Sequence, residues 1–384
     1  IDATSTIDVS DTGFLGARQP GNTGNNSGRT IGNPSANGSF GENGASHGGL
    51  GGARSGGPNA TYGDFMNPSQ PGSGGGGSNA FNCNCMGGNG GGFLRLTADT
   101  LVLDGSIAAN GGSAAQSFAG AGSGGAVVLD VTTLSGTGSI SADGGEHTST
   151  GGGGSGGGGR VAIRYDDATG FSLSNVSAAP GLAGSIGVGL EAGAGTIFLR
   201  DETFDVVGRL VVDGENLAEV DVTPLRAIGE GNSTLIEPNT LTDTGRSFPL
   251  PNPATGAVGL IGLELSPGPN TTNTYTVVGN TATELFTDPA DGDMTLAAAT
   301  GEAYIGVYVL DDLEVRGGAA LATGDAIQVL GNLGTALSID GDIDAPELRL
   351  DNTTDLTVPG GRLALDALVA PSLANLTVDA AGTL

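Results

Sequence analysis

Lysine and tryptophan are absent from this chain of 384 residues, so all 13 of its basic residues are arginines. Aspartate and glutamate together number 41, which gives a formal net charge of −28. Nucleic-acid phosphates require a basic surface, so this composition argues against a nucleic-acid partner. No apolar run approaches the roughly 18 residues of a membrane-spanning helix, so we expect no membrane insertion.

Cysteine is scarce as well, and the two cysteines, Cys83 and Cys85, are separated by one residue. This spacing is too short for a zinc finger and no second pair exists, so a metal site shared with His47 is disfavoured. We expect a disulfide, either local or between chains, in a secreted protein. Because the sequence starts at Ile1 without an initiator methionine or a signal sequence, we expect an internal start, after processing or within a longer chain.

Histidine is limited to His47 and His147, both in glycine-rich stretches. Enzymes that act on polysaccharides need carboxylates clustered with basic or imidazole groups. The paired acids Asp166-Asp167 and Asp311-Asp312 are instead typical of solvated strand ends. We therefore predict that the chain is not an enzyme, and a polysaccharide-active enzyme is kept only as a third interpretation.

Glycine supplies 74 of the 384 residues. The stretch from residue 93 to residue 145 contains the same pattern twice. The apolar residues Leu96, Leu101 and Ile107 recur 33 positions later as Leu129, Leu134 and Ile140. A looser third copy begins at Arg160 and a fourth at Thr196. In the fourth copy the matching residues are Leu199, Phe204, Gly208, Leu210 and Val212. A fixed period of roughly 20 to 50 residues is the signature of a solenoid.

Each copy contains short apolar runs with a period of two, and no amphipathic helix of useful length is present. The sequence therefore predicts an all-β fold: a parallel β-helix, expected to be right-handed, with ordered glycine-rich segments and a small inserted antiparallel β subdomain. Ordered glycine runs must satisfy their backbone hydrogen bonds. We expect them to form extended, polyproline-II-like segments that pack side by side, where the missing side chain permits close approach.

Four regions follow from this pattern. Residues 1–92 hold a first coil and a glycine-rich segment, and residues 93–240 hold coils with glycine-rich loops. Residues 241–306 are rich in proline and are predicted to form the inserted subdomain. In residues 307–384 the coils return at shorter spacing, since Leu356-Thr357-Val358 and Leu376-Thr377-Val378 are 20 positions apart.

The two ends of the chain complement each other. The C-terminal segment followed by the N-terminal segment matches one internal coil, residues 313–329. Neither end shows an obvious cap, and an exposed strand edge invites association. We therefore expect identical copies to stack head to tail, as separate chains or as covalent repeats. The junction residues are expected to be Leu376, Val378, Leu384, Ile1, Ile7 and Val9.

Three glycine-rich stretches, residues 62–75, 134–145 and 156–165, resemble the glycine-rich tandem-repeat modules of giant bacterial surface proteins, which are adhesin-like. The resemblance covers roughly residues 1–225, and residues 276–295 are more weakly similar to a β module of such proteins. It implies secretion, a location outside the cell or on its surface, and a structural or adhesive role. It supplies no catalytic residues.

Aspartates in one tight turn, Asp288, Asp291 and Asp293, are candidate calcium ligands, because hard cations bind several oxygens from such turns. Their spacing departs from the EF-hand loop, and turn chemistry alone also explains them. Calcium is the one cofactor that the sequence suggests. Asp340, Asp342 and Asp344 alternate and are expected to form a solvated acidic face of a strand.

We predict a structural repeat unit of an extracellular bacterial filament or giant cell-surface protein, stacked head to tail through the ends of its coils. The alternative is an adhesin module that binds surface glycans or another surface, with residues 241–306 as the binding tip. Deletion of that region is expected to abolish adhesion and to leave filaments intact.

Overall fold

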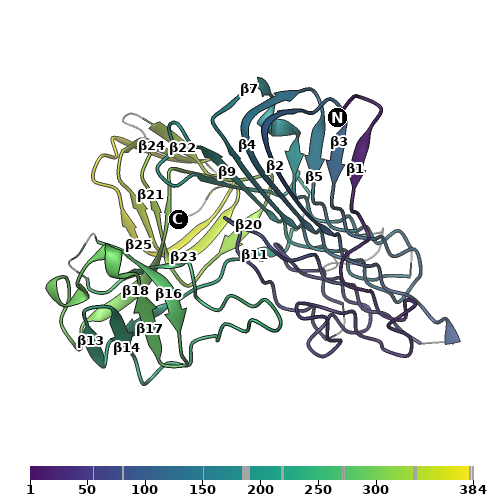
Figure 1. The fold of residues 1–384 in the computed structure, drawn as a ribbon, viewed down its shortest axis with the longest axis horizontal. Coiled ribbons are helices and arrows are strands. Elements are labelled where there is room, and N and C mark those ends of the chain that lie inside the picture. The colour runs from purple at the N-terminus through teal and green to yellow at the C-terminus, as the bar shows by residue number, and fades with distance from the viewer. Residues whose placement is uncertain are drawn as a thin grey trace.

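Strands take up 39% of the chain and helices 3% in the computed structural model, so the chain is nearly all β, as predicted. The structure describes residues 1–382 apart from 55, 80–81, 150, 184–190, 218–219, 270, 272, 332–334 and 380–381. Figure 1 shows one group of strands from β1 to β9, a second group formed by the later part of the chain, and long strand-free segments below the first group.

The first group contains two sheets. In the four-stranded sheet all described pairs are parallel, in the order β1 (Thr6–Asp8), β3 (Ser106–Ala108), β5 (Ser139–Ser141) and β8 (Val176–Ser177). The seven-stranded sheet has the order β19 (Asp312–Arg316), β10 (Arg209–Asp213), β9 (Thr196–Asp201), β6 (Arg160–Tyr165), β4 (Ala126–Gly136) and β2 (Phe93–Val102), with β7 (Asp167–Phe171) beside β4. In this sheet the β9–β10 pair is antiparallel and the other described pairs are parallel.

The second group also contains two sheets. The twelve-stranded sheet has the order β11 (Val222–Pro224), β20 (Ala320–Ala322), β23 (Asp342–Leu350), β21 (Ala326–Val329), β18 (Ala303–Leu310), β15 (Glu264–Ser266), β16 (Tyr275–Asn280), β17 (Glu284–Thr287), β14 (Thr240–Thr242) and β13 (Leu235–Glu237), and β12 (Glu230–Asn232) and β25 (Leu363–Val369) flank it. The three-stranded sheet is parallel and consists of β22 (Thr335–Ser338), β24 (Thr353–Val358) and β26 (Asn375–Val378). Short 3₁₀ turns are η2 (Leu173–Asn175), η3 (Pro289–Asp291) and η4 (Met294–Leu296).

The predicted parallel β-helix is wrong. Parallel pairing does continue from Leu96 to Leu129, then to Ile163 and Leu199. After Leu199 the chain reverses through a turn that ends at Gly208, whose φ of 129° is disfavoured for other residues, and β10 then runs antiparallel to β9. The described strands therefore form several mixed sheets and no closed solenoid.

The antiparallel region also differs from the predicted inserted subdomain, both in where it begins and in how it connects to the other strands. The antiparallel strands begin at Leu235 in β13, before the predicted boundary at residue 241. They do not form a separate unit, because β15 pairs with β18 and joins them to the twelve-stranded sheet. Edge pairing with a neighbouring strand satisfies the backbone groups of β15, which a free-standing hairpin would leave to solvent.

The glycine-rich segments lie side by side, hydrogen-bonded backbone to backbone. Gly44 donates its N–H to the carbonyl of Gly52 at 2.9 Å, and Gly120 donates to Gly76 at 2.9 Å. A Cβ on Gly44 would lie 1.7 Å from the carbonyl oxygen of Ser155. Only residues without a side chain fit at such distances, which is the physical reason for the high glycine content.

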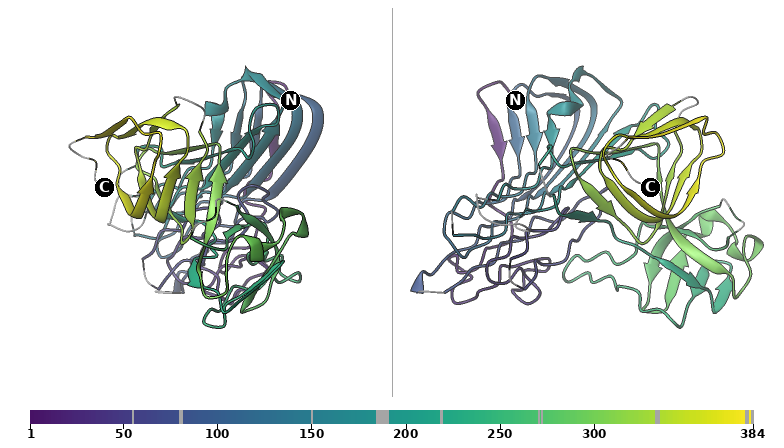
Figure 2. Two further views of the ribbon diagram at one scale, coloured as in Figure 1. Left: turned by 90° about the vertical axis from the view of Figure 1, so that its left-hand side faces the viewer. Right: turned by 180° about the vertical axis from the view of Figure 1, so that it is seen from behind.

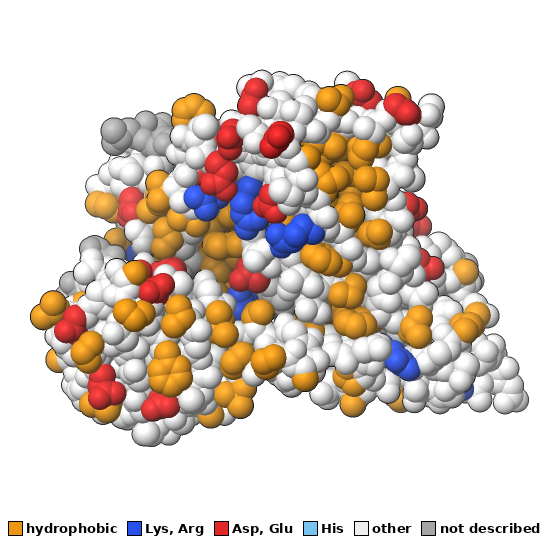
Figure 3. Space-filling view, in the orientation of Figure 1, with side chains coloured by type: hydrophobic (Ala, Val, Ile, Leu, Met, Phe, Trp, Pro, Cys, Tyr) orange, Lys and Arg blue, Asp and Glu red, His pale blue; other side chains and the backbone are white. Residues whose placement is uncertain are grey.

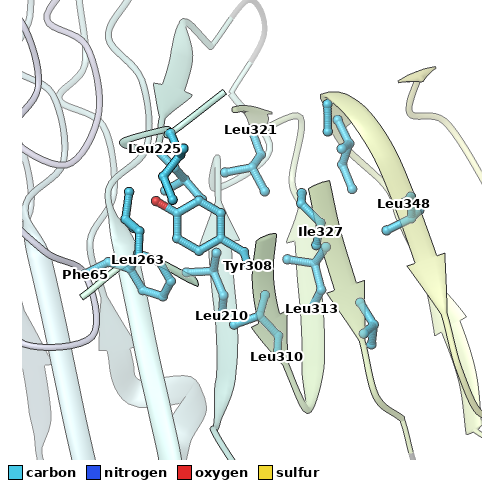
Figure 4. Packing of buried hydrophobic residues seen from close by; sticks show 14 of the residues in the cluster. Phe65, Leu210, Leu225, Leu263, Tyr308, Leu310, Leu313, Leu321, Ile327 and Leu348 are labelled. Atoms are coloured by element: carbon cyan, nitrogen blue, oxygen red, sulfur yellow. The ribbon is translucent and has the colours of Figure 1, made fainter. Parts of the chain in front are cut away.

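Two apolar clusters hold the sheets together. One lies between the four-stranded and seven-stranded sheets and contains Ile107, Leu129, Ile140 and Ile163. The larger one fills the second group of strands (Figure 4). Phe65, from a glycine-rich segment, joins the larger cluster, with its ring 5.6 Å from that of Tyr308 and 6.0 Å from that of Phe198. Phe65 thus attaches the glycine-rich segments to both groups of strands.

Candidate functional site

Four edge strands lie at two opposite sides of the molecule, two strands on each side. Among the described strands, β1 pairs with β3, and β2 pairs with β4; we call β1 and β2 the first edge. Likewise β25 pairs with β23, and β26 pairs with β24; we call β25 and β26 the last edge. Figure 2 shows the N-terminal strands on one side of the molecule and the C-terminal strands on the opposite side. Each edge presents one strand from each of two sheets, and its outer backbone groups have no neighbouring strand in the described part of the chain.

The first edge exposes an apolar layer. Ile7, Leu94 and Leu96 are partly buried and pack against the cluster between the two sheets. Phe93 and Val102, at the two ends of β2, are 37% and 49% exposed. Because no described strand lies on the outward side of β1 and β2, a further strand laid against the first edge would bury these residues.

The last edge is more exposed. Leu376 and Val378 on β26 are 44% and 37% exposed, and Leu368 and Val369 on β25 are 36% and 45% exposed. Unpaired strand edges with exposed apolar residues promote pairing with another chain, so soluble monomers normally cover them or place charges on them. The last edge therefore has the properties of an interaction surface.

The residues predicted to form the junction divide between the two edges. Ile7 lies in β1 and Ile1 and Val9 flank it, all three packed against the same cluster. Leu376 and Val378 lie in β26. Leu384 lies outside the described residues. The structure thus brings together the residues of each half of the junction, with the two halves at opposite sides of one copy.

Negative charge accompanies both edges. The backbone N–H of Ser10 donates to the carboxylate of Asp8, the last residue of β1, and hydrogen bonds from Ser10 lower the pKa of that carboxyl. On the other side Asn375 donates to Asp355 at 2.5 Å and, with Thr354, lowers the pKa of that carboxyl. Both carboxyls therefore stay ionised at neutral pH, so two copies that meet at these edges repel each other through their charges.

Two of the candidate calcium ligands cap their own turns, and the third accepts a hydrogen bond from β16. Asp288 accepts from the backbone N–H of Ala290, and Asp293 accepts from that of Thr295. Asp291 accepts from the N–H of Thr276 at 2.7 Å. Within the described residues no group of three or more His, Cys, Asp or Glu is placed to hold a metal ion. Calcium binding stays a prediction, which calorimetric titration of the purified chain would test.

The other residues singled out from the sequence lie outside the four edge strands, although Asp342 and Asp344 are in β23, next to β25. Cys83 and Cys85 are joined by a local disulfide with their Cα atoms 5.1 Å apart. Asp340, Asp342 and Asp344 lie on the outward face of their segment, where Asp342 accepts from the N–H of Arg362 at 2.8 Å.

A buried polar cluster, missed by sequence reasoning, joins the glycine-rich segments to the seven-stranded sheet. The guanidinium of Arg160 donates to the carbonyl of Tyr62 and to the hydroxyl of Thr196, each at 3.0 Å. His47 donates its Nδ1–H to the carbonyl of Gly124 at 2.9 Å. Burial, with the charge of Arg160 nearby, lowers the pKa of His47 to about 3. The neutral, inaccessible imidazole is therefore a structural group. One indication of this polar cluster was present in the sequence: Arg160 stands at the repeat position that is occupied by Ala126 and Thr196 in the neighbouring copies.

No protein-family model matches this chain, and no curated protein or solved structure is significantly similar to it. Within its described residues, the structure contains no helix with both the length and the apolarity of a membrane span. The edges and the packing of the chain are therefore the basis on which its function is inferred.

Proposed function

We propose that this chain is a structural repeat unit of an extracellular bacterial filament or giant cell-surface protein, in which identical copies stack head to tail. The observation that carries the proposal is the pair of exposed parallel edges on opposite sides of the molecule. The location outside the cell is supported by the resemblance of the glycine-rich stretches to bacterial surface modules and by the Cys83–Cys85 disulfide, which persists in oxidising compartments.

The two edges match in the number of strands that they present and in the direction in which these strands pair. Each offers two strands from two sheets, and each strand pairs with its inner neighbour in parallel. When β25 and β26 of one copy lie against β1 and β2 of the next, both sheets continue across the contact. The contact joins two different surfaces, so it leaves a free first edge and a free last edge at every step. Such a contact produces a linear assembly when its rotation does not close a ring.

Apolar burial and backbone hydrogen bonds both favour this contact. Stacking would cover Leu376, Val378 and Val369 on one copy and Phe93 and Val102 on the next. It would also give strand partners to the outer N–H and C=O groups of four strands, which have no neighbouring strand among the described residues of one copy. The function needs no cofactor, because the load along such an assembly is borne by the backbone ladders and the apolar cluster.

Substitution of the last edge tests the proposal. We expect the double variant Leu376→Lys with Val378→Lys to remain monomeric at concentrations where the unaltered chain assembles, because lysine side chains on an edge strand oppose pairing. Leu296→Lys is the matched control, since Leu296 is 87% exposed on η4 and lies away from both edges. Sedimentation velocity reports the assembly. Equal assembly of all three proteins would contradict the proposal.

A second candidate function is an adhesin whose residues 241–306 bind carbohydrate or another surface. The exposed apolar residues Leu250, Val278 and Leu296 in this region favour it. Deletion of the region is not a clean test, because β15 pairs with β18 in the twelve-stranded sheet. Leu250→Ser with Leu296→Ser leaves the sheet intact, and we expect this variant to lose binding to cells or glycan arrays if the region adheres. Unchanged binding would remove the adhesin role.

A further inference from the structure

A cavity of about 280 Å³ lies where several distant parts of the chain meet. Most of its walls come from the glycine-rich segment around Phe65, from residues 262–264 at the start of β15, and from β18 around Tyr308. Val207, Arg226 and Thr274 complete the lining. Figure 4 shows Phe65, Leu263 and Tyr308 next to one another although they belong to three segments. In the space-filling view a hollow with apolar side chains on its floor opens near the centre of the molecule (Figure 3).

The walls of this cavity are apolar and partly aromatic. Phe65 and Leu263 are 4% exposed and Tyr308 is 5% exposed, so the side chains that form the walls are fixed by the surrounding packing. The ring of Phe65 is tilted by 43° relative to that of Tyr308. A wall of two mutually inclined rings favours a third ring, which gains edge-to-face contacts in addition to apolar burial.

The charged side chains that line the cavity already have partners within the protein. Arg226 donates to the carboxylate of Asp64 at 2.8 Å and to the carbonyl of Gly259 at 2.8 Å. Asp64 also accepts from the backbone N–H of Met66 at 2.7 Å. Glu264 accepts from the hydroxyl of Thr276 at 2.9 Å. A ligand therefore does not need to supply a charge or a hydrogen bond to these groups.

The hydroxyl of Tyr308 is also satisfied by the protein, since it donates to the carbonyl of Arg226 at 2.5 Å. Tyr308 thus offers the cavity the face of its ring rather than a polar atom. Apolar cavities hold water weakly because water needs two to four polar partners, and a cavity of roughly 150 Å³ already accepts benzene. The larger volume here suits a molecule of one or two rings.

We propose that this cavity is a binding site for a neutral aromatic molecule of one or two rings. The ligand is recognised by shape and apolar contact with Phe65, Leu263 and Tyr308. The site is independent of the edges, so it does not rest on the head-to-tail contact. Because its walls come from several segments, a bound ring also links the glycine-rich segment to the antiparallel strands.

Indole is a suitable probe because the chain contains no tryptophan, so indole emission in the mixture comes only from the ligand. We expect the emission of indole to shift to shorter wavelength on binding to the intact chain, with saturation at one molecule per chain. Glucose, a hexose whose hydroxyls need polar partners, is expected not to compete. A failure of indole to bind, or displacement of indole by glucose, would overturn the proposal.

Two adjacent valines provide a matched pair of variants. Val207 lines the cavity and is half-buried, whereas Val206 is 70% exposed and is not one of the lining residues. We expect Val207→Phe to fill the cavity and weaken indole binding by at least about tenfold, and Val206→Phe to leave it unchanged. Val309→Phe, on a half-buried residue of β18 that also lines the cavity, repeats the test if Val207→Phe does not fold. Equal affinity of the Val207 and Val206 variants would show that indole binds elsewhere and would overturn the assignment.

Discussion

Leu376 on β26 lies directly beside Leu356 on β24 in parallel register, and among the described residues no strand continues this row beyond Leu376. The opposite side of the molecule has the same relationship, since Ile7 on β1 lies beside Ile107 on β3 and the row ends at Ile7. Each sheet group therefore stops at an edge to which a further parallel strand can be added. This pair of open rows is the structural basis of the proposed head-to-tail assembly.

Ionic strength should control the assembly. Every copy carries a net charge of −28, so neighbouring copies repel one another unless salt screens their charges. When salt rises from about 0.01 M to about 0.1 M, the screening length falls from roughly 30 Å to roughly 10 Å. We expect the average sedimentation coefficient to increase over this range at fixed protein concentration. A decrease would indicate that ion pairs, rather than apolar strand edges, hold the copies together.

Glycine packing should make single methyl groups destabilising. A Cβ on Gly44 would lie 1.7 Å from a carbonyl oxygen, whereas a Cβ on Gly57 would meet no atom within 4 Å. We expect Gly44→Ala to lower the free energy of unfolding by about 1–3 kcal/mol, because the close-packed segments must move apart. Gly57→Ala should leave stability unchanged or raise it by up to about 1 kcal/mol. Thermal unfolding of the two variants measures this, and equal melting temperatures would show that the segments are not closely packed.

The buried His47 should make the chain less stable in mild acid. Its pKa is about 3 in the folded chain, against an ordinary value of 6.5 in the unfolded chain. Between these values the unfolded chain binds a proton that the folded chain does not, so stability falls as the pH drops from 6.5 towards 3. At pH 5 the loss is about 2 kcal/mol. Urea unfolding at pH 7 and pH 5 should show a stability change that is more unfavourable, by about this amount, in the unaltered chain than in His47→Gln, because the other titrating groups act on both proteins alike. The same loss in both proteins would contradict the assignment to His47.

Asp325 should have the opposite pH dependence. Burial raises the pKa of this carboxyl to about 6, although the backbone N–H groups of Gly229 and Ile228 donate to it. The folded chain therefore holds a proton that the unfolded chain has lost between pH 3.8 and 6, so the contribution of Asp325 to stability falls as the pH rises through about 6. We expect Asp325→Asn to remove this fall, which urea unfolding at pH 4.5 and pH 7 would detect. A steeper fall in the variant would contradict the buried-acid account.

The sequence correctly predicted the register of those strand pairs in which apolar side chains repeat at a fixed spacing. The 33-residue repeat correctly placed Leu96 beside Leu129 and Leu101 beside Leu134, and the 20-residue spacing correctly placed Leu356 beside Leu376. The fourth copy was misread because Phe204 matched the apolar pattern. Phe204 is 86% exposed in a turn where its N–H donates to Asp201, and the chain reverses there. Periodicity detects repeated apolar positions but not the change of direction between them.

Side-by-side packing of the glycine-rich segments was predicted, but the partner of each segment and the cavity could not be derived from sequence patterns. Backbone contacts such as Gly120 with Gly76 involve no side chain, so no residue pattern records which segments meet. The cavity forms from Phe65, Leu263 and Tyr308, which lie far apart along the chain and have no local signal in common. Arg160 was the one residue that indicated a buried polar contact with the glycine-rich segments. It occupies the same row as Ala126 and Thr196, which are buried in the neighbouring copies.

Electron microscopy of the purified chain tests the central claim most directly. We predict linear particles that lengthen with protein concentration, in which copies repeat at one fixed step and β25 and β26 of one copy lie against β1 and β2 of the next. Single copies at every concentration and salt, or contacts made through any other surface, would contradict the head-to-tail assembly.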